Sequence, residues 1–227
     1  LLATVPDEWI IDRPAAAVPL VDREWTREWE SQFHPIQMGE RLWICPSWTP
    51  PPDPSATNIL LDPGLAFGTG SHPTTAMCLR ALDAGVTSGI RLVDYGCGSG
   101  ILGIAGARLG AGSVLGVDND PQAILASGAN AAGNGVTPSQ FSAVLPDDAL
   151  IEQWAGTTDW VIANILAGPL VALKPVLTHL LTPGGQLTLA GLLEKQAKEV
   201  IEAYAPDVAL AVVDQREEWV LLSGRAV

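Results

Sequence analysis

The stretch 94-DYGCGSG-100 places three glycines within seven residues, directly after the apolar run 90-IRLVD-94. We expect that run to be a strand and residues 101–109 to be a helix, because apolar residues dominate on both sides of the glycines. Glycine permits positive φ angles and lets a ligand approach the backbone closely. The stretch is therefore either a tight turn or the loop of a nucleotide site, and the surrounding sequence decides between the two.

Strand and helix patterns alternate from residue 90 onward, which predicts an α/β fold with a Rossmann-like, doubly wound sheet. The sheet should have seven mostly parallel strands and close with an antiparallel hairpin, since no helix separates the last two strands. After the first strand, the expected strands are 113–118, 141–145, 159–164, 186–190, 208–214 and 217–224. The expected helices are 74–82, 101–109, 121–134, 167–181 and 193–204.

Two acidic residues indicate which nucleotide the glycine loop would hold. Asp118 ends the second predicted strand, where nucleotide-binding folds carry the acid that accepts hydrogen bonds from ribose hydroxyls. Dinucleotide sites use G-x-G-x-x-G around a pyrophosphate, whereas this loop reads D-x-G-x-G-x-G, and Asp94 would repel a pyrophosphate. An acid there suits a ligand with an ammonium or sulfonium cation, which indicates S-adenosyl-L-methionine (SAM). The hairpin agrees, because it resembles that of the class I SAM-dependent methyltransferase fold, and it counts against an NAD-dependent oxidoreductase.

Composition narrows the class of protein. The 227 residues are 48% hydrophobic and carry a formal net charge of −13, a field that disfavours nucleic acid and attracts cationic partners. The chain has no run of about 18 apolar residues, so we expect no membrane span. Its three cysteines and three histidines lack ligand spacing, which predicts a reducing, cytoplasmic location and no metal site.

The N-terminal part follows a different pattern. Asp22 suits the cap of a helix that ends near Phe33 and carries an aromatic stripe. The proline-rich segment 50-PPPDP-54 reads as a stiff connector. We therefore expect two domains: residues 1–50, an N-terminal remnant with a linker helix, and residues 51–227, the SAM-dependent methyltransferase domain.

A second glycine-rich stretch, 64-GLAFGTGSHPTT-75, precedes the first strand of the alternating pattern. It is no P-loop, because a P-loop needs a Lys-Ser/Thr pair after its last glycine. We expect it to be a lid over the methionine end of the cofactor. Phe67 would either shield the sulfonium or pack in the core. Thr75 would either reach the cofactor or cap the following helix.

The segment 164-NILAG-168 ends the fourth strand of the alternating pattern. Many amino-group methyltransferases carry Asn/Asp-Pro-Pro-aromatic at this position, where the asparagine oxygen and the following carbonyls accept N–H groups of the incoming nitrogen. We expect Asn164, Ile165 and Leu166 to act in this way, and an N-cap role for Asn164 is compatible with it. Leu166 and Ala167 replace the second proline and the aromatic residue, so stacking is lost. That loss favours an aliphatic amine over a base or a glutamine amide.

An amine must be neutral to accept a methyl group. A lysine pKa near 10.4 lies about three units above cellular pH, so exposing the lone pair costs about 4 kcal/mol. No residue has a strong claim as general base, and we expect proximity, desolvation and acceptors for the N–H groups to suffice. His72 is a candidate proton acceptor, although a structural role suits it better.

Several segments together closely resemble the ribosomal protein L11 methyltransferase family. The similarity runs from about Trp25 to the end of the chain, and the lid and 164-NILAGPL-170 are its most specific parts. The other segments that carry it are 28-EWESQFHPIQMGERLWICPSW-48, 62-DPGLAFGTGSHPTT-75, 94-DYGCGSGILGIA-105, 118-DNDPQA-123 and 217-EEWVLLSGR-225.

The resemblance implies a cytoplasmic enzyme that moves methyl groups from SAM to the N-terminal α-amine and lysine ε-amines of free ribosomal protein L11, before ribosome assembly. It also implies a ferredoxin-like recognition domain at the N-terminus, for which residues 1–21 are too few. Two alternatives stay open: methylation of another amine or amide, and a non-catalytic SAM-binding module in ribosome assembly. The family's cofactor positions match Thr75, Gly96, Asp118 and Asn164. The full set of expected cofactor-binding residues is Phe67, Gly68, Thr69, Thr75, Asp94, Gly96, Gly98, Gly100, Asp118, Asn119 and Asn164.

Overall fold

The computed structural model describes residues 33–62, 72–147 and 149–227. The helix expected over 22–33 and the lid residues Phe67, Gly68 and Thr69 lie almost wholly outside these ranges. The chain divides into two compact units, Leu1–Phe33 and His34–Val227, and the description below concerns the second. The domain boundary expected at residue 50 falls inside that second unit.

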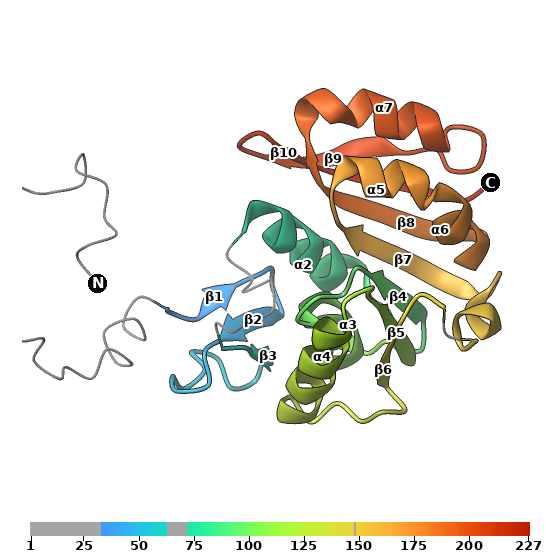
Figure 1. Cartoon of the computed structure of the whole chain (residues 1–227). Helices are drawn as coiled ribbons and strands as arrows, with labels where there is room; N and C mark the ends of the chain where they lie inside the picture. The colour runs from blue at the N-terminus through green and yellow to red at the C-terminus, as the bar shows by residue number, and fades with distance from the viewer. Residues whose placement is uncertain (1–32, 63–71, 148) are drawn as a thin grey trace, which may run out of the picture. The chain divides into compact units, whose positions relative to one another are not determined.

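A seven-stranded sheet forms the centre of the unit, in the order β6-β5-β4-β7-β8-β10-β9 (Figure 1). The first five strands in this order are parallel, and β10 pairs antiparallel with both β8 and β9. The predicted fold class, including its terminal hairpin, is therefore confirmed. The bounds are β4 (Arg91–Tyr95), β5 (Ser113–Val117), β6 (Phe141–Val144), β7 (Thr158–Asn164), β8 (Leu181–Leu193), β9 (Ala211–Arg216) and β10 (Trp219–Arg225).

Helices cover both faces of this sheet, and Figure 1 shows α2, α3 and α4 gathered on one side with α5, α6 and α7 on the other. Each face of the sheet has its own hydrophobic core: the first core includes residues of α2 and α3, and the second includes residues of α5, α6 and α7. Side chains of β7 alternate between them, so that Ile162 packs in the first core and Val161 in the second. Both faces of the strand are therefore buried, as in other parallel sheets flanked by helices. The helices are α2 (Pro73–Gly85), α3 (Ile101–Leu109), α4 (Pro121–Gly133), α5 (Ala167–Ala172), α6 (Lys174–Leu180) and α7 (Glu194–Tyr204), with a short 3-10 helix at Ile151–Trp154.

The prediction of a single helix over 167–181 is wrong, because two helices, α5 and α6, occupy that range. Pro175 explains the break. It has no N–H to donate to Val171, and its ring would collide with that carbonyl in a continuous helix. It sits instead in the first turn of α6, where proline is tolerated.

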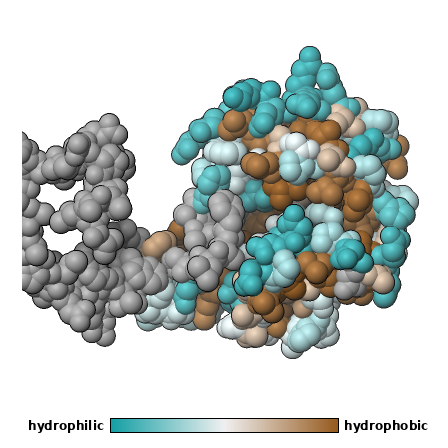
Figure 2. All heavy atoms as spheres, viewed as in Figure 1, coloured by the Kyte–Doolittle hydropathy of each residue, from teal (hydrophilic) through white to brown (hydrophobic). Residues whose placement is uncertain are grey.

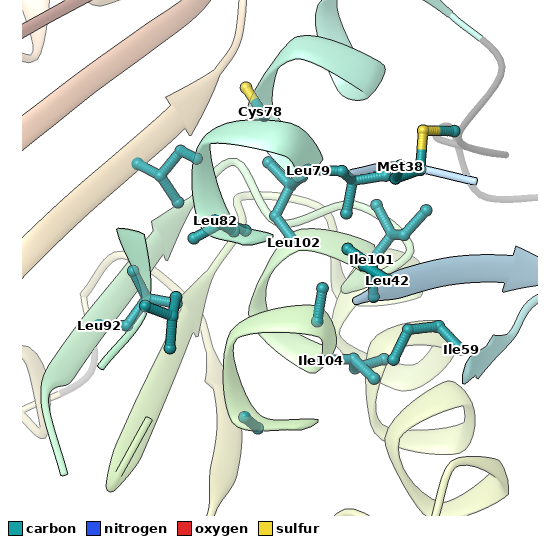
Figure 3. Close-up of a cluster of buried hydrophobic side chains, with 14 of the residues drawn as sticks. Met38, Leu42, Ile59, Cys78, Leu79, Leu82, Leu92, Ile101, Leu102 and Ile104 are labelled. Carbon is teal, nitrogen blue, oxygen red and sulfur yellow. The ribbon is translucent and has the colours of Figure 1, made fainter. Parts of the chain in front are cut away.

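A small second sheet joins β1 (Ile36–Gln37), β2 (Leu42–Cys45) and β3 (Thr57–Leu60). Its apolar side chains pack into the first core beside α2 and α3, where Figure 3 shows Leu42 and Ile59 among the helix residues. Asp83 of α2 fastens the sheet, since its carboxylate accepts hydrogen bonds from the backbone N–H groups of Glu40 and Arg41 at 2.7 and 3.2 Å. The sheet and α2 are therefore tied together by burial and by polar contacts.

Two features are absent from the part of the chain that the structure describes. Within residues 33–62, 72–147 and 149–227, no helix is long and apolar enough to cross a membrane. The same residues contain no cluster of three histidine, cysteine or acidic side chains placed to hold a metal ion.

Candidate active site

A cavity of about 700 Å³ opens at the carboxyl ends of the central parallel strands. The strand order reverses between β4 and β7, because β5 and β6 lie on one side of β4 while β7 and β8 lie on the other. Ligands of open α/β sheets bind at such a switch point. Figure 2 shows hydrophobic surface gathered toward the middle of the face on view, with hydrophilic surface around it. The described residues that line the cavity are His72, Thr74, Thr75, Tyr95, Gly96, Cys97, Gly98, Ile101, Leu102, Asp118, Asn119, Pro146, Asn164, Ile165, Leu166, Pro169, Leu173, Gly191 and Trp219.

The glycine loop is held against the end of β5. The backbone N–H groups of Gly96 and Cys97 both donate to the carbonyl of Val117, at 2.7 and 3.0 Å. Gly96, Gly98 and Gly100 have φ angles of 81°, 53° and 79°, which other residues adopt only with strain. The loop therefore has a fixed shape, and its residues Gly96, Cys97 and Gly98 form part of the cavity wall.

Two glycines close on Ile165 from separate strands. A Cβ added at Gly96 would overlap the Ile165 side chain, and one added at Gly191 would overlap the Ile165 backbone. Glycine is needed at both positions because a side chain there would collide with Ile165. Ile165 is therefore held between β4 and β8. Sequence reasoning missed Gly191, although a glycine inside a strand pattern signals such an approach.

Asp118 takes the place expected of a ribose acceptor, at the end of β5 and in the cavity wall. One carboxylate oxygen accepts the N–H of Gly98 at 2.9 Å, and the other accepts the N–H of Asp120 at 3.0 Å. These bonds orient the carboxylate while each oxygen keeps a second lone pair. Asp118 is thus positioned by backbone contacts to accept two hydroxyl groups.

Asp94 lies behind the glycine loop and is not among the lining residues. Its side chain is 1% exposed, and one oxygen accepts the N–H of Gly103 at 2.9 Å. The other oxygen has no hydrogen-bond partner among the described residues. Burial raises the pKa of Asp94 to about 7, and the charge of Asp118 also raises it while the Gly103 N–H lowers it. Contact between Asp94 and a ligand cation stays a prediction.

Asn164 and Thr75 meet at the opposite end of the cavity. The Asn164 side-chain amide donates a hydrogen bond to Thr75 Oγ1 at 3.2 Å. This contact uses the NH₂ group of Asn164, so the amide oxygen is the atom available for an incoming N–H group. The next residues along the chain, Ile165 and Leu166, line the cavity too, and Leu166 is 67% exposed. The N-cap role considered for Asn164 is wrong, because Leu166 is the N-cap of α5.

His72 is the N-cap of α2, so the capping role considered for Thr75 belongs to His72. Its Nδ1 lies 2.7 Å from Thr74 Oγ1 and accepts the Thr74 N–H at 3.3 Å. The structural role preferred for His72 is thus present. Its ring also contacts Trp219 edge to face, with centroids 5.0 Å apart.

The predicted site residues divide into three groups. Eight line the cavity: Thr75, Gly96, Gly98, Asp118, Asn119, Asn164, Ile165 and Leu166. Asp94 and Gly100 do not line it, since Asp94 is buried behind the loop and Gly100 caps α3 against Ser127. Phe67, Gly68 and Thr69 fall outside the described residues. Lining residues that the sequence did not single out include Tyr95, Gly191 and Trp219, which come from three different strands.

Comparison with known proteins agrees with this geometry. The chain matches the family model of ribosomal protein L11 methyltransferase (PrmA) over residues 11–226. A ribosomal protein L11 methyltransferase of Vibrio cholerae is 53% identical over 90% of this chain and 68% of that protein. Another, from Marinobacter nauticus, is 50% identical over 99% of this chain and 76% of that protein.

A solved structure gives the same result. The crystal structure of ribosomal protein L11 methylase from Lactobacillus delbrueckii subsp. bulgaricus superposes with a TM-score of 0.74 at 32% identity, over 86% of this chain and 99% of that one. The match to the family model, over residues 11–226, spans the glycine loop, Asn164 and the terminal hairpin. The chain belongs to the ribosomal protein L11 methyltransferase family.

Proposed function

We propose that this chain transfers methyl groups from SAM to the N-terminal α-amine and lysine ε-amines of ribosomal protein L11. Membership of the family makes it a SAM-dependent methyltransferase. The names of its relatives support ribosomal protein L11 as the substrate. The observation that carries the chemistry is the hydrogen bond from Asn164 to Thr75, because it presents an amide oxygen to the cavity.

The lining residues fit SAM at both ends of the cavity. Gly96 and Gly98 form a cradle without side chains, and Asp118 offers two acceptor oxygens for the ribose hydroxyls. Thr75 and Asn164 would border the methionine end. When bound, SAM supplies a methyl group on a positively charged sulfur, and no lysine or arginine lines the described cavity to repel that charge.

Asn164, Ile165 and Leu166 orient the amine. The amide oxygen of Asn164 accepts an N–H group and aims the lone pair of nitrogen along the line of attack, whereas the Leu166 carbonyl already accepts the N–H of Leu170 at 3.1 Å. The nitrogen forms a bond to the methyl carbon as the carbon–sulfur bond breaks, and the resulting ammonium loses a proton to water. We assign His72 no role as base, because its Nδ1 accepts the Thr74 N–H at the N-cap of α2. The exposed Leu166 marks the side from which solvent reaches the nitrogen.

The net charge of −13 suits a basic ribosomal protein as partner. We place the reaction in the cytoplasm, on free ribosomal protein L11 before ribosome assembly, without direct binding to nucleic acid or membrane. The same charge would repel assembled RNA, which favours the free protein.

The test combines binding and turnover. Titration calorimetry of the chain with SAM, and separately with NADH, should show binding of SAM alone. The variant Asn164→Ala should then lose methyl transfer to ribosomal protein L11 by at least a hundredfold while SAM binding persists. The control Gln215→Ala removes an exposed amide in β9 and should behave as the parent does. Unchanged transfer by Asn164→Ala would refute the assignment, and SAM binding without any transfer would favour a non-catalytic module.

A further inference from the structure

An aromatic pair stands in the cavity wall and has no part in the mechanism above. His72 precedes α2, and Trp219 is the first residue of β10; their rings meet at 5.0 Å with an interplanar angle of 70°. Backbone pairing fixes Trp219 on both sides, to Leu193 of β8 and to Arg216 of β9. The indole is therefore held by the sheet and is not a loop side chain.

This pair lies beside the reacting corner. His72 and Thr75 are three residues apart, about one helical turn, and Thr75 accepts the hydrogen bond of Asn164. Asn164 bonds to Thr75, His72 contacts Trp219, Thr75 and His72 both belong to the start of α2, and all four residues line one cavity. Trp219 borders the space in which the amine nitrogen would react.

That space contains little that can stabilise a cation. Among the described lining residues, the only carboxylate belongs to Asp118, which is bonded to the glycine loop at the nucleoside end. Nδ1 of His72 is engaged by the Thr74 N–H. Every methyl transfer nevertheless leaves a positive charge on nitrogen. Among aromatic side chains, the indole of tryptophan attracts such a cation most strongly.

We propose that Trp219 binds the methylated ammonium group of the substrate and so determines how many methyl groups one amine receives. This inference rests on the proposed function. As the new carbon–nitrogen bond forms, positive charge moves from sulfur to nitrogen, and the indole stabilises that charge. The ammonium then releases a proton to water, the demethylated cofactor is exchanged for a second SAM, and the neutral alkylamine, kept beside the ring, would accept the next methyl. After the third transfer no proton remains, and the quaternary cation leaves.

A packing role is the alternative, because Trp219 also contacts the first hydrophobic core. Two variants separate the roles. Trp219→Phe keeps a π face, and Trp219→Leu keeps apolar bulk without one. Both remove the same indole N–H and leave a similar gap, so a structural role would make them alike. Thermal unfolding and SAM affinity of both variants report any loss of fold.

The first measurement is the methylation state of ribosomal protein L11 over time by mass spectrometry. Wild type and Trp219→Phe should pass through mono- and dimethyl species to trimethylated amines. Trp219→Leu should slow all three transfers, and should slow the second and third, which need the alkylamine kept beside the ring, about tenfold more than the first, which corresponds to about 1.4 kcal/mol. Equal product distributions for Trp219→Leu and wild type would overturn the inference and leave the proposed function intact. No methylation by wild-type enzyme with SAM bound would overturn both.

The second measurement isolates charge from shape. A peptide that carries one trimethyl-lysine is compared, as an inhibitor, with the same peptide in which carbon replaces the quaternary nitrogen. Wild type and Trp219→Phe should prefer the cation by about three- to tenfold, and Trp219→Leu should show no preference. Equal inhibition of wild type by the two peptides would show that the ring provides apolar contact only, and would refute the proposal.

Discussion

The side chain of Asn164 donates its amide hydrogen to Thr75 Oγ1 at 3.2 Å and so joins the end of β7 to the first turn of α2. Thr75 is 1% exposed, so water does not compete for this contact. The bond holds the amide of Asn164 in one orientation, with its oxygen available for the substrate nitrogen.

Removing the acceptor should therefore impair catalysis more than folding. In Thr75→Val the amide of Asn164 loses its partner and rotates, and we expect kcat at saturating SAM to fall about tenfold, as for the loss of one buried hydrogen bond. Thr75→Ser keeps the hydroxyl and should retain most of the parent activity. The test is the kcat of both variants, measured by steady-state kinetics with ribosomal protein L11 as substrate. Equal kcat values for the valine and serine variants would show that the hydrogen bond is dispensable.

Gly96 provides a test of the loop geometry. Its φ angle is 81°, and an added Cβ would overlap Ile165, so Gly96→Ala should lower the free energy of unfolding by about 1–3 kcal/mol and weaken SAM binding. Gly128 of α4 has open space around its Cα, and Gly128→Ala should be neutral or stabilising by up to about 1 kcal/mol. Urea unfolding and calorimetry measure both effects. Parent-like SAM affinity in Gly96→Ala would contradict the close approach.

Asp118 should govern SAM affinity. Asp118→Ala removes two acceptor oxygens and releases the N–H of Gly98, so we expect the Kd for SAM to rise by ten- to a hundredfold, as for the loss of charge-assisted hydrogen bonds. Glu199→Ala removes the same charge from an exposed position on α7 and should leave the Kd within about twofold of the parent value. If the two variants bind SAM alike, the carboxylate at the end of β5 is not a ribose acceptor.

Asp94 should make stability depend on pH. Its pKa is raised from 3.8 to about 7, chiefly by burial, so between these values the folded chain binds one more proton than the unfolded chain. Stability contributed by the neutral carboxyl is then full below about pH 4 and is lost as pH rises toward 7. Between pH 5 and 7.5, wild type should lose about 2 kcal/mol more unfolding free energy than Asp94→Asn, which cannot titrate. Urea unfolding at both pH values measures this difference, and parallel losses would show that Asp94 is ionised throughout.

The local sequence pattern predicted the seven strands of the main sheet and most of its helices, because the periodicity of apolar residues and the positions of glycines depend only on residues close together in the chain. The same reasoning placed Gly96, Gly98 and Asp118 at strand ends, and parallel strands bring such ends to one edge. It failed at Pro175, where a strong apolar period outweighed the rule that proline breaks a helix interior.

The sequence alone determined the candidate site residues that lie at strand ends: the glycine loop, Asp118 and the Asn164 segment each follow one strand of a strand-to-helix unit and line the cavity. The tertiary structure decided which distant residues complete the site. Thr75 and Asn164 are 89 positions apart, and Gly191 and Trp219 reach the cavity through pairing of β8 and β10. It also decided that Asp94 faces the backbone of α3. Contacts of this kind depend on how strands pair and helices pack, so the periodicity of apolar residues along the sequence does not predict them.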